Sequence, residues 1–439
     1  MELRRLIFQN ILWRGLYFIS AFILNIVVAR LLNADGSGEV FYIINNLSLT
    51  LLVIGLSLES GATYYIAKHE IDNSKIAFFL FFWSLIGTAI SILFFHWIIN
   101  DSVYISNFRW EYITGCVCYI SGFLFITYFS ALFFAKHDFF VSNFILFCVN
   151  LLMIAFFILT NNQSFIHQHF IIIYFSSFLL QGLALMLIYF FKNVSFKNIK
   201  FLSGAEFKKL FSYSLLALLS NLIFFLVYRV DYWFVKKFCT ESDLGNYIQV
   251  SKIGQMFFVL PSIIGSVIFP IISAGQQQVK TKLKAIALAL LLLYFVLCVI
   301  LIAAGKWLFP HIYGNSFEKM YSPFLFSIPG ILSLSMLYPF TAYFSGKKRI
   351  DINLKGALLA LVLIVAGDII FIPRYGISGA ALISSFGYIL YQFYVMFFFA
   401  KEYKVSVASL FSVSSGELNK LYSIIVKDFF NANNKNGKR

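Results

Sequence analysis

The sequence predicts an all-α polytopic membrane protein with twelve transmembrane helices. Of its 439 residues, 60% are hydrophobic and only 12% are charged, whereas soluble domains carry about 25% charged residues. Apolar runs of about 20 residues, the length at which a helix crosses a bilayer, recur along most of the chain. Lys and Arg gather in alternate connections between these runs. Composition, segment length and charge placement therefore indicate the same fold class.

Twelve apolar runs are long enough to span a bilayer, and none shows the strict alternation of a membrane β-barrel strand. Several exceed 20 residues, so tilted helices or helices that extend beyond the bilayer are expected. The first run is too long for a signal peptide and is expected to be retained. The predicted spans are residues 11–32, 39–60, 76–99, 110–135, 139–160, 165–191, 210–235, 244–274, 283–304, 322–345, 354–372 and 377–400.

The basic residues predict the orientation of these spans. With the N-terminus in the cytoplasm, 24 of the 34 Lys and Arg residues lie in cytoplasmic segments, 7 lie on the outside and 3 lie within spans. Cytoplasmic loops of membrane proteins carry an excess of Lys and Arg, so both termini are expected in the cytoplasm. The net charge of +15 is then mainly a topology signal that faces anionic lipid. No nucleic-acid partner is expected.

The segment 192–209 is the longest polar break between spans, and it divides the chain six helices from six. We therefore predict an N-terminal bundle (1–191), a cytoplasmic linker (192–209), a C-terminal bundle (210–400) and a cytoplasmic tail (401–439). "NADGSGEVFYI" at 33–43 resembles "TESDLGNYIQV" at 240–250, and 133–147 resembles 343–357, at offsets of 207 and about 211 residues. These pairs favour a parallel pseudo-repeat of two six-helix bundles.

The tail carries apolar residues at helical spacing, which favours an amphipathic helix on the inner leaflet. A plain solvated tail is the alternative. The residues that set this spacing are Leu410, Leu418, Leu421, Ile425 and Phe429.

The sequence lacks the signatures of several enzyme classes. It contains no phosphate-binding G-x-x-x-x-G-K-[ST] loop and no G-x-S-x-G nucleophile motif. No metal or cofactor is expected. A membrane enzyme that builds sugar chains would need a larger pocket-forming loop on the outside than this chain offers. These features favour a transporter over an enzyme.

Few ionisable residues lie within the spans, where each costs about 2.5–3.5 kcal/mol on insertion scales. Arg229 and Asp231 stand in "LVYRVDYWFVKK", in the outer part of the seventh span. Arg229 either lines a cavity, with Asp231 as its charge partner or as an ion-coupling group, or it extends to the outer interface beside an aromatic belt. Lys252, about 14 Å into the eighth span, faces a cavity or belongs to a buried structural pair.

Two further ionisable residues lie nearer the inner side of the membrane. Arg14, in the first span, is consistent with a cavity position or with the inner interface. Glu59 ends the second span and is either a boundary residue or a charge partner. Three span cations against few span anions would make a cavity positive. Such a cavity favours an anionic ligand, and phosphate or diphosphate matches the bidentate geometry of Arg.

Residues 229–273 carry a pattern that resembles polysaccharide flippases of the multidrug/oligosaccharidyl-lipid/polysaccharide exporter superfamily. The resemblance lies in Asp231, the Leu244-Gly245-Xaa-Tyr247 turn, Lys252, Pro261 and Pro270. "FIPRYGISGAALISSFGY" at 371–388, "YGNSF" at 313–317 and "NADGSGEVFYI" at 33–43 are also similar to this family. The resemblance implies two six-helix bundles around a central cavity.

The resemblance further implies a substrate, an oligosaccharide repeat unit of O-antigen or capsule linked to undecaprenyl diphosphate. This substrate would be flipped from the inner to the outer leaflet of the bacterial inner membrane by alternating access. Lys252, Arg229 and Arg14 are the positions that could hold the substrate, and Asp231 and Glu59 could couple an ion or balance charge. Membrane lipids, a polysaccharide polymerase and a chain-length regulator are the implied partners.

Two alternatives remain from the sequence. The first is a multidrug or cation antiporter of the same fold, although such exporters rely more on buried carboxylates. The second is a membrane polysaccharide polymerase. Lipid II flippases of the same superfamily usually have fourteen spans, so twelve spans disfavour that branch.

Overall fold

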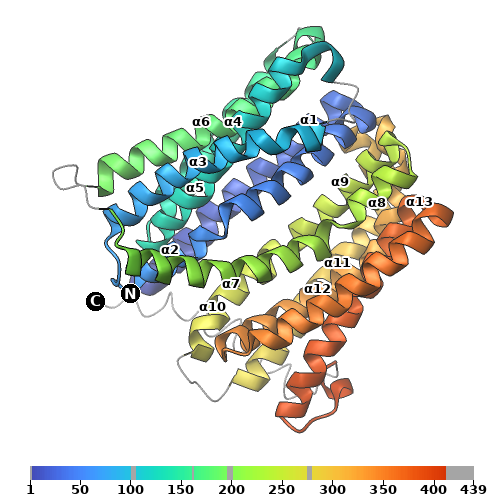
Figure 1. The fold of residues 1–439 in the computed structure, drawn as a ribbon. Coiled ribbons are helices and arrows are strands. Elements are labelled where there is room, and N and C mark those ends of the chain that lie inside the picture. Colours follow the sequence, from blue (N-terminus) through green and yellow to red (C-terminus); the bar gives the residue numbers. More distant parts are fainter. Residues whose placement is uncertain (1, 100–104, 161–162, 195–200, 274–278, 412–439) are drawn as a thin grey trace, which may run out of the picture. The chain divides into compact units, whose positions relative to one another are not determined.

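The computed structural model describes residues 2–99, 105–160, 163–194, 201–273 and 279–411, and this part of the chain contains helices and no strands. The predicted all-α fold is therefore confirmed for the described residues (Figure 1). The helices are α1 (Glu2–Gly55), α2 (Leu58–Ala67), α3 (Asn73–Ile99), α4 (Ile105–Ala135), α5 (Phe139–Leu159), α6 (Gln163–Asn193), α7 (Gly204–Arg229), α8 (Asp231–Phe238), α9 (Glu241–Phe257), α10 (Val259–Ser273), α11 (Val279–Tyr313), η2 (Asn315–Met320), α12 (Tyr321–Gly346), α13 (Ile350–Glu402) and η3 (Val407–Leu410).

Ten helical segments in the described residues are long and apolar enough to cross a membrane. Two of them are too long for a single crossing. The segments Leu12–Gly55 and Ile350–Glu402 have 44 and 53 residues, or about 66 and 80 Å at 1.5 Å per residue, against a hydrocarbon core of about 30 Å. Each contains one non-helical residue near its middle, Asn33 and Gly376 respectively. Counting each as two spans gives the twelve that the sequence predicts.

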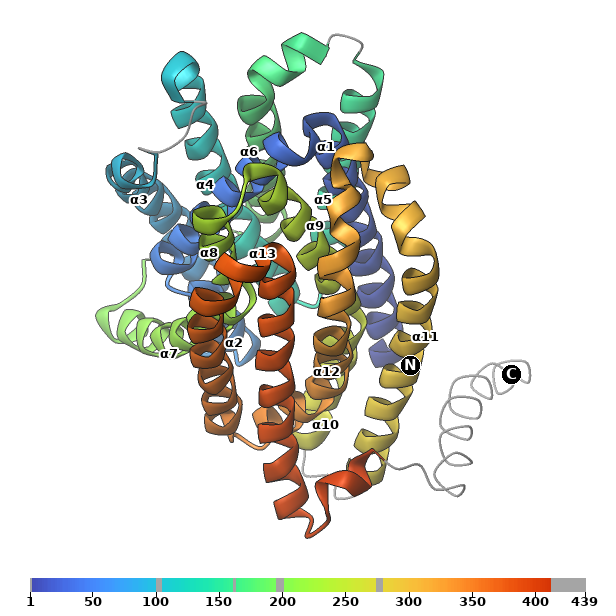
Figure 2. The same cartoon turned by 90° about the vertical axis from the view of Figure 1, so that its right-hand side faces the viewer.

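The two limbs of α13 lie side by side (Figure 2). A Cβ atom at Gly367 would lie 2.5 Å from Ile383, and one at Gly387 would lie 2.6 Å from Ile364. These pairs are symmetric about Gly376, whose φ of 57° turns the chain, because glycine adopts this left-handed conformation without steric cost. The limbs are therefore antiparallel, and the predicted connection between 372 and 377 is correct.

The chain divides into two compact units, unit 1 (Met1–Phe225) and unit 2 (Leu226–Arg439). The boundary lies inside α7, downstream of the polar 192–209 segment. In unit 1, α4 and α6 pack side by side (Figure 1), and Gly122 and Gly182 let their backbones approach too closely for any larger residue. Small residues commonly allow such contact between membrane helices.

A buried polar network also ties the helices of unit 1 together. The Asn150 amide in α5 donates to Ser20 Oγ in α1 at 3.1 Å, and the Gln181 amide in α6 donates to Asn150 Oδ1 at 3.2 Å. All three side chains are buried. In lipid, where water cannot serve as a partner, such interhelical hydrogen bonds help to specify which helices associate.

Breaks in the helices occur at the spacing predicted for the pseudo-repeat. Asn33 interrupts α1, and Thr240, 207 residues later, caps α9 after the extended residue Cys239. His137 and Lys348, 211 residues apart, both have a φ of 60° directly after a helix. The predicted amphipathic tail helix falls almost entirely on 412–439, outside the described residues.

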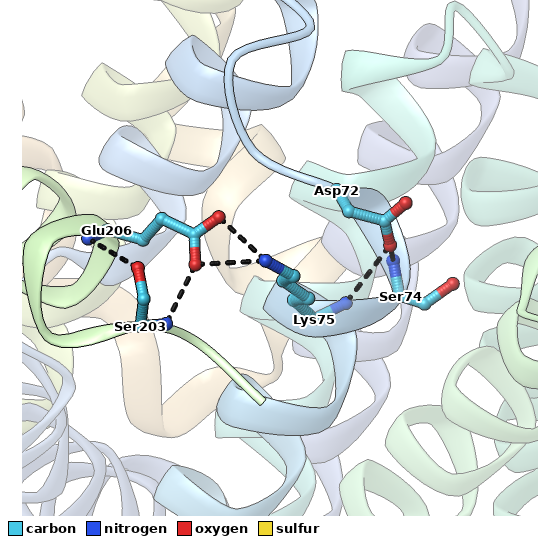
Figure 3. Close-up of polar contacts among 5 residues, drawn as sticks. All are labelled: Asp72, Ser74, Lys75, Ser203 and Glu206. Carbon is cyan, nitrogen blue, oxygen red and sulfur yellow. Dashed lines mark hydrogen bonds and ion pairs between the residues drawn. The ribbon is translucent and has the colours of Figure 1, made fainter. Parts of the chain in front are cut away.

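Within unit 1, an ion pair that also belongs to a helix cap attaches the start of α7 to the start of α3 (Figure 3). Glu206 accepts from Lys75 Nζ at 2.8 and 3.1 Å and from the Ser203 backbone N–H at 2.7 Å. The Ser203 hydroxyl accepts from the Glu206 N–H at 3.3 Å, which completes a capping box. Asp72 in turn caps the first turn of α3, where Lys75 lies. One carboxylate therefore joins the starts of two helices.

Glu206→Gln should lower the stability of the protein, because it weakens both the cap and a largely covered ion pair. Together these contribute about 1–2 kcal/mol. The charge swap K75E/E206K should recover less than the full loss, because a lysine cannot accept the capping hydrogen bond. Thermal unfolding of the purified protein measures both effects. The Lys209–Glu70 pair, 3.7 Å apart with side chains 61% and 38% exposed, supplies the control: Glu70→Gln should change Tm little. Equal losses for Glu206→Gln and Glu70→Gln would contradict this account.

Candidate functional site

The polar centre of unit 2 is built around a buried carboxylate at the junction of α7 and α8. Only Val230 separates the end of α7 from Asp231, the first residue of α8. Asp231 is 2% exposed. Its Oδ2 accepts hydrogen bonds from the hydroxyls of Tyr247 in α9 and Ser384 in α13, the latter at 3.1 Å. Its Oδ1 is buried and has no hydrogen-bond partner in the described part of the chain.

A second buried carboxylate, Asp368 in the first limb of α13, faces the same centre. It is fully buried, and neither of its oxygens has a hydrogen-bond partner among the described residues. Asp231 and Asp368 repel each other electrostatically. Two carboxylates in a low-dielectric interior cannot both remain ionised without compensation. The pair is therefore suited to hold a proton or a small cation.

Arg229 is the cation that links the two predicted cations to this carboxylate centre. Arg229, the last residue of α7, acts electrostatically on Asp231 and on Lys252 in α9. Both cationic side chains are half-buried. Of the five residues chosen from the sequence, Asp231 and Lys252 each interact electrostatically with Arg229. Arg229 and Asp231 interact electrostatically, although Val230 between them has helical backbone angles (φ −63°, ψ −33°).

A cavity of about 40 Å³ adjoins this centre, with room for about three water molecules. Tyr247 and Ser384, which hold Asp231, line it, and so do Ser251 and Gln255 of α9. Tyr228 and Tyr388 also line it, with their ring centroids 5.7 Å apart. The lining is therefore aromatic and hydroxyl-rich. Arg229 and Lys252 directly follow the lining residues Tyr228 and Ser251 but do not line this cavity themselves.

The other two predicted residues lie in unit 1 and occupy separate places there. Arg14 is half-buried in α1, and its guanidinium lies 5.7 Å from the ring of Phe18, one turn along the same helix. Glu59 is half-buried in the first turn of α2. Its carboxylate accepts a long hydrogen bond of 3.5 Å from Ser60. No contact joins Arg14 to Glu59 in the described residues.

Glu59 follows a break between α1 and α2 that the sequence does not predict. Leu56 and Ser57 both have left-handed backbone conformations, with φ of 52° and 51°. Side chains from other helices satisfy the freed backbone: Trp83 donates to the Ile54 carbonyl and Tyr128 to the Gly55 carbonyl, each at 3.0 Å. Unwound segments inside membrane helices persist only where protein or a hydrated cavity satisfies them. The break places Glu59 at the positive end of α2.

Sequence reasoning missed Asp368, Tyr247 as a hydrogen-bond donor, and Ser384. A charge within the apolar run "LVLIVAGDIIFI" at 361–372 was the available signal for Asp368. Asp368 lies near the outer end of the predicted span 354–372. No group of three or more His, Cys, Asp or Glu residues suited to a metal ion occurs in the part of the chain that the structure describes.

Twelve spans in two units, with charged groups buried in the spans, define a multi-pass membrane protein with the fold of known transporters. The chain resembles lipid II flippase MurJ in its inward closed conformation, with a TM-score of 0.70 and 15% identity over 95% of this chain and 92% of that one. It also resembles an inward-facing multidrug resistance MATE family transporter of the MOP superfamily (TM-score 0.67, 14% identity, 91% and 96% coverage). A third match is the MATE transporter VcmN of Vibrio cholerae (TM-score 0.65, 10% identity, 92% and 97% coverage).

The family itself is shown by the sequence. Residues 27–322 match the family described as polysaccharide biosynthesis protein, and the chain belongs to it. No curated protein sequence matches the chain. The resemblance to the exporter superfamily drawn from residues 229–273 and 371–388 is therefore confirmed at the level of family and fold. The match to MurJ covers nearly all of that flippase, so the twelve-span count does not separate this fold from the lipid II branch.

Asp368→Asn should make the protein at least as stable as the wild type in buffer without Na⁺ or Li⁺, because it removes one of two adjacent buried charges. A gain of about 1–3 kcal/mol is expected. Acid, Na⁺ or Li⁺ should raise the Tm of the wild type and should raise that of the variant less. Thermal unfolding across pH and cation concentration measures both the stability of the variant and the change of Tm, and a variant of an exposed carboxylate, Glu318→Gln, serves as the control. A variant that is less stable than the wild type and keeps the full rise of Tm with cations would contradict the interpretation that Asp231 and Asp368 together hold one proton or cation.

Proposed function

We propose that the protein flips an undecaprenyl-diphosphate-linked oligosaccharide, a repeat unit of O-antigen or capsule, from the inner to the outer leaflet of the bacterial inner membrane. The observation that carries the proposal is the grouping of Arg229 and Lys252 at membrane depth in a member of a polysaccharide biosynthesis family. Two half-buried cations within one charge centre favour an anionic headgroup. A guanidinium beside an ammonium suits the several oxygens of a diphosphate.

In this proposal Arg229 and Lys252 bind the diphosphate while the lipid tail stays in the bilayer. Arg14 is proposed as a further substrate-binding cation, and Glu59 as an ion-coupling or charge-balancing group. Alternating access between the two units would carry the headgroup across. Entry of a dianionic group next to Asp231 is unfavourable unless that carboxylate is neutralised. A proton or cation at the Asp231–Asp368 pair would therefore favour loading, and its release would favour unloading.

The proposed setting is the inner membrane with both termini in the cytoplasm, supported by the distribution of Lys and Arg. The bundle boundaries proposed from the sequence, 1–191 and 210–400 with the linker 192–209, apply to this transport unit. The protein would act as a transporter and not as an enzyme. A polysaccharide polymerase and a chain-length regulator would use the flipped product. The tail 401–439 would lie on the inner leaflet.

Complementation of a flippase-deficient strain tests the proposal. The wild-type chain should restore surface polysaccharide. The variant R229A/K252A should reduce it at least about tenfold, because charge-assisted hydrogen bonds contribute about 1.5–3 kcal/mol each. Membrane insertion is checked by the amount of protein in the membrane fraction. The matched control K237A/K306A removes two exposed cations and should retain activity. Normal surface polymer from R229A/K252A at normal expression would refute the assignment of these residues.

A multidrug or cation antiporter is the second candidate, and the buried Asp231–Asp368 pair together with the likeness to MATE transporters favours it. A cationic cargo would need a carboxylate as its partner. Expression should then lower the accumulation of cationic dyes, and Asp231→Asn should abolish that effect. Unchanged accumulation in cells that express the wild type would count against this function.

A further inference from the structure

The described turns that adopt a left-handed backbone are divided by charge. Those in the connections at the predicted outer side, Asn33, Gly314 and Gly376, carry no charge. Those in the connections at the predicted cytoplasmic side are His or Lys, and the uncharged Leu56 and Ser57 lie within the second predicted span. The cytoplasmic set is His69, His137, Lys348 and Lys404, with φ of 56°, 60°, 60° and 53°. Each follows the end of a helix, respectively α2, α4, α12 and α13.

These positions are ones where glycine is the favoured residue. After α12, the Lys348 N–H bonds to the Ser345 carbonyl at 3.1 Å and the Arg349 N–H bonds to the Phe344 carbonyl at 2.8 Å. This is the hydrogen-bonded helix end that usually places glycine in the left-handed position. A side chain there destabilises the turn relative to glycine. The chain uses glycine at the outer turn Gly376 and not at Lys348 or Lys404, so fold stability does not explain the two lysines.

The lysines that precede two of these residues fold back onto the protein, whereas Lys348 and Lys404 do not. The Lys68 amine lies 4.5 Å from the centre of the Tyr64 ring, a contact that raises its pKa above the ordinary value. Lys347 pairs with Glu402 and lies 4.9 Å from the ring of Tyr343. Lys348 and Lys404 are both exposed, and no side-chain hydrogen bond or ion pair joins either to another described residue.

In unit 2 the two basic turns are joined. The Tyr343 hydroxyl, in α12, donates to Glu402 at the end of α13 at 2.9 Å and lies 3.0 Å from the Tyr403 hydroxyl. The ion pair of Lys347 with Glu402 takes up the negative charge between the turns. The exposed Arg349 and Lys401 add to the positive charge of this corner. Tyrosines at the ends of membrane helices lie at headgroup depth, so this pair of turns is placed at the membrane surface.

We propose that Lys348 and Lys404 form a binding site for the phosphate of an anionic phospholipid in the inner leaflet. Both lysines are exposed, and the hydrogen bond between Tyr343 and Tyr403 joins the two turns that carry them. Two lysines near an anionic surface contribute enough to change lipid affinity by about tenfold or more. The site depends on the orientation of the chain and not on the cargo, so it can hold or fail independently of the proposed flippase activity.

Lipid binding and stability of the purified full-length protein test the proposal. The lipid probe is phosphatidylglycerol, with phosphatidylcholine as the neutral comparison and inorganic phosphate as a soluble anion. K348G/K404G removes both charges and also places glycine at the two left-handed positions, which relieves their backbone strain. K348Q/K404Q removes the charges and keeps that backbone strain. K237Q/K306Q removes two exposed cations at the predicted outer side as a matched control. Native mass spectrometry gives the affinities, and thermal unfolding gives Tm.

Both inner-side variants should bind phosphatidylglycerol about tenfold more weakly than the wild type and the control. In phosphatidylcholine alone, K348G/K404G should have a Tm about 2 °C higher than the wild type, and K348Q/K404Q should not. Equal phosphatidylglycerol affinity in all proteins would overturn the site. A Tm of K348G/K404G below that of the wild type would overturn the claim that lysine destabilises these two turns relative to glycine. An equal rise of Tm with inorganic phosphate would overturn the assignment to lipid.

Discussion

Burial of ionisable side chains within apolar helices is the constraint on which the rest of the structure depends. Each such charge costs about 2.5–3.5 kcal/mol to place at membrane depth, so a stable bundle groups its charges where they can compensate one another. Unit 2 does this at one centre. Asp231 and Asp368 are buried, Arg229 and Lys252 are half-buried nearby, and the hydroxyls of Tyr247 and Ser384 fix one carboxylate oxygen. Such a centre can change its net charge by one proton or cation, which is the property that a coupled transporter requires.

The same constraint explains how far the fold could be predicted from the sequence. Lipid contact demands apolar composition, so the twelve spans appear directly as apolar runs, and the predicted ends agree with the helices to within several residues at most positions. The predicted connection between 372 and 377 coincides with the reversal of α13 at Gly376. The break at Leu56 and Ser57 could not be predicted. Neither residue type signals a left-handed turn, and the groups that satisfy it, Trp83 and Tyr128, come from distant parts of the chain.

The site was predictable in part for a related reason. Depth within a span identified Arg229, Asp231 and Lys252, because a charge in an apolar run is visible without knowledge of its partners. The partners were not visible. Ser384 lies 153 residues from Asp231 in the chain, and Asp368 becomes important only because α13 folds back and brings it to the same centre. The distance of a charge from the end of a span is therefore a weak guide where the limbs of a helical hairpin pack tightly.

Affinity for the anionic headgroup tests the central claim most directly. Binding of undecaprenyl diphosphate and of the uncharged undecaprenol to the purified protein should be measured with and without Na⁺, at neutral and acidic pH, for the wild type and for R229Q/K252Q. The charge centre predicts that the wild type binds the diphosphate at least about tenfold more tightly than undecaprenol, and more tightly still when Na⁺ or acid neutralises Asp231 and Asp368. The variant should lose this preference. Equal affinity of wild type and variant for the diphosphate, with no dependence on cation or pH, would contradict the account.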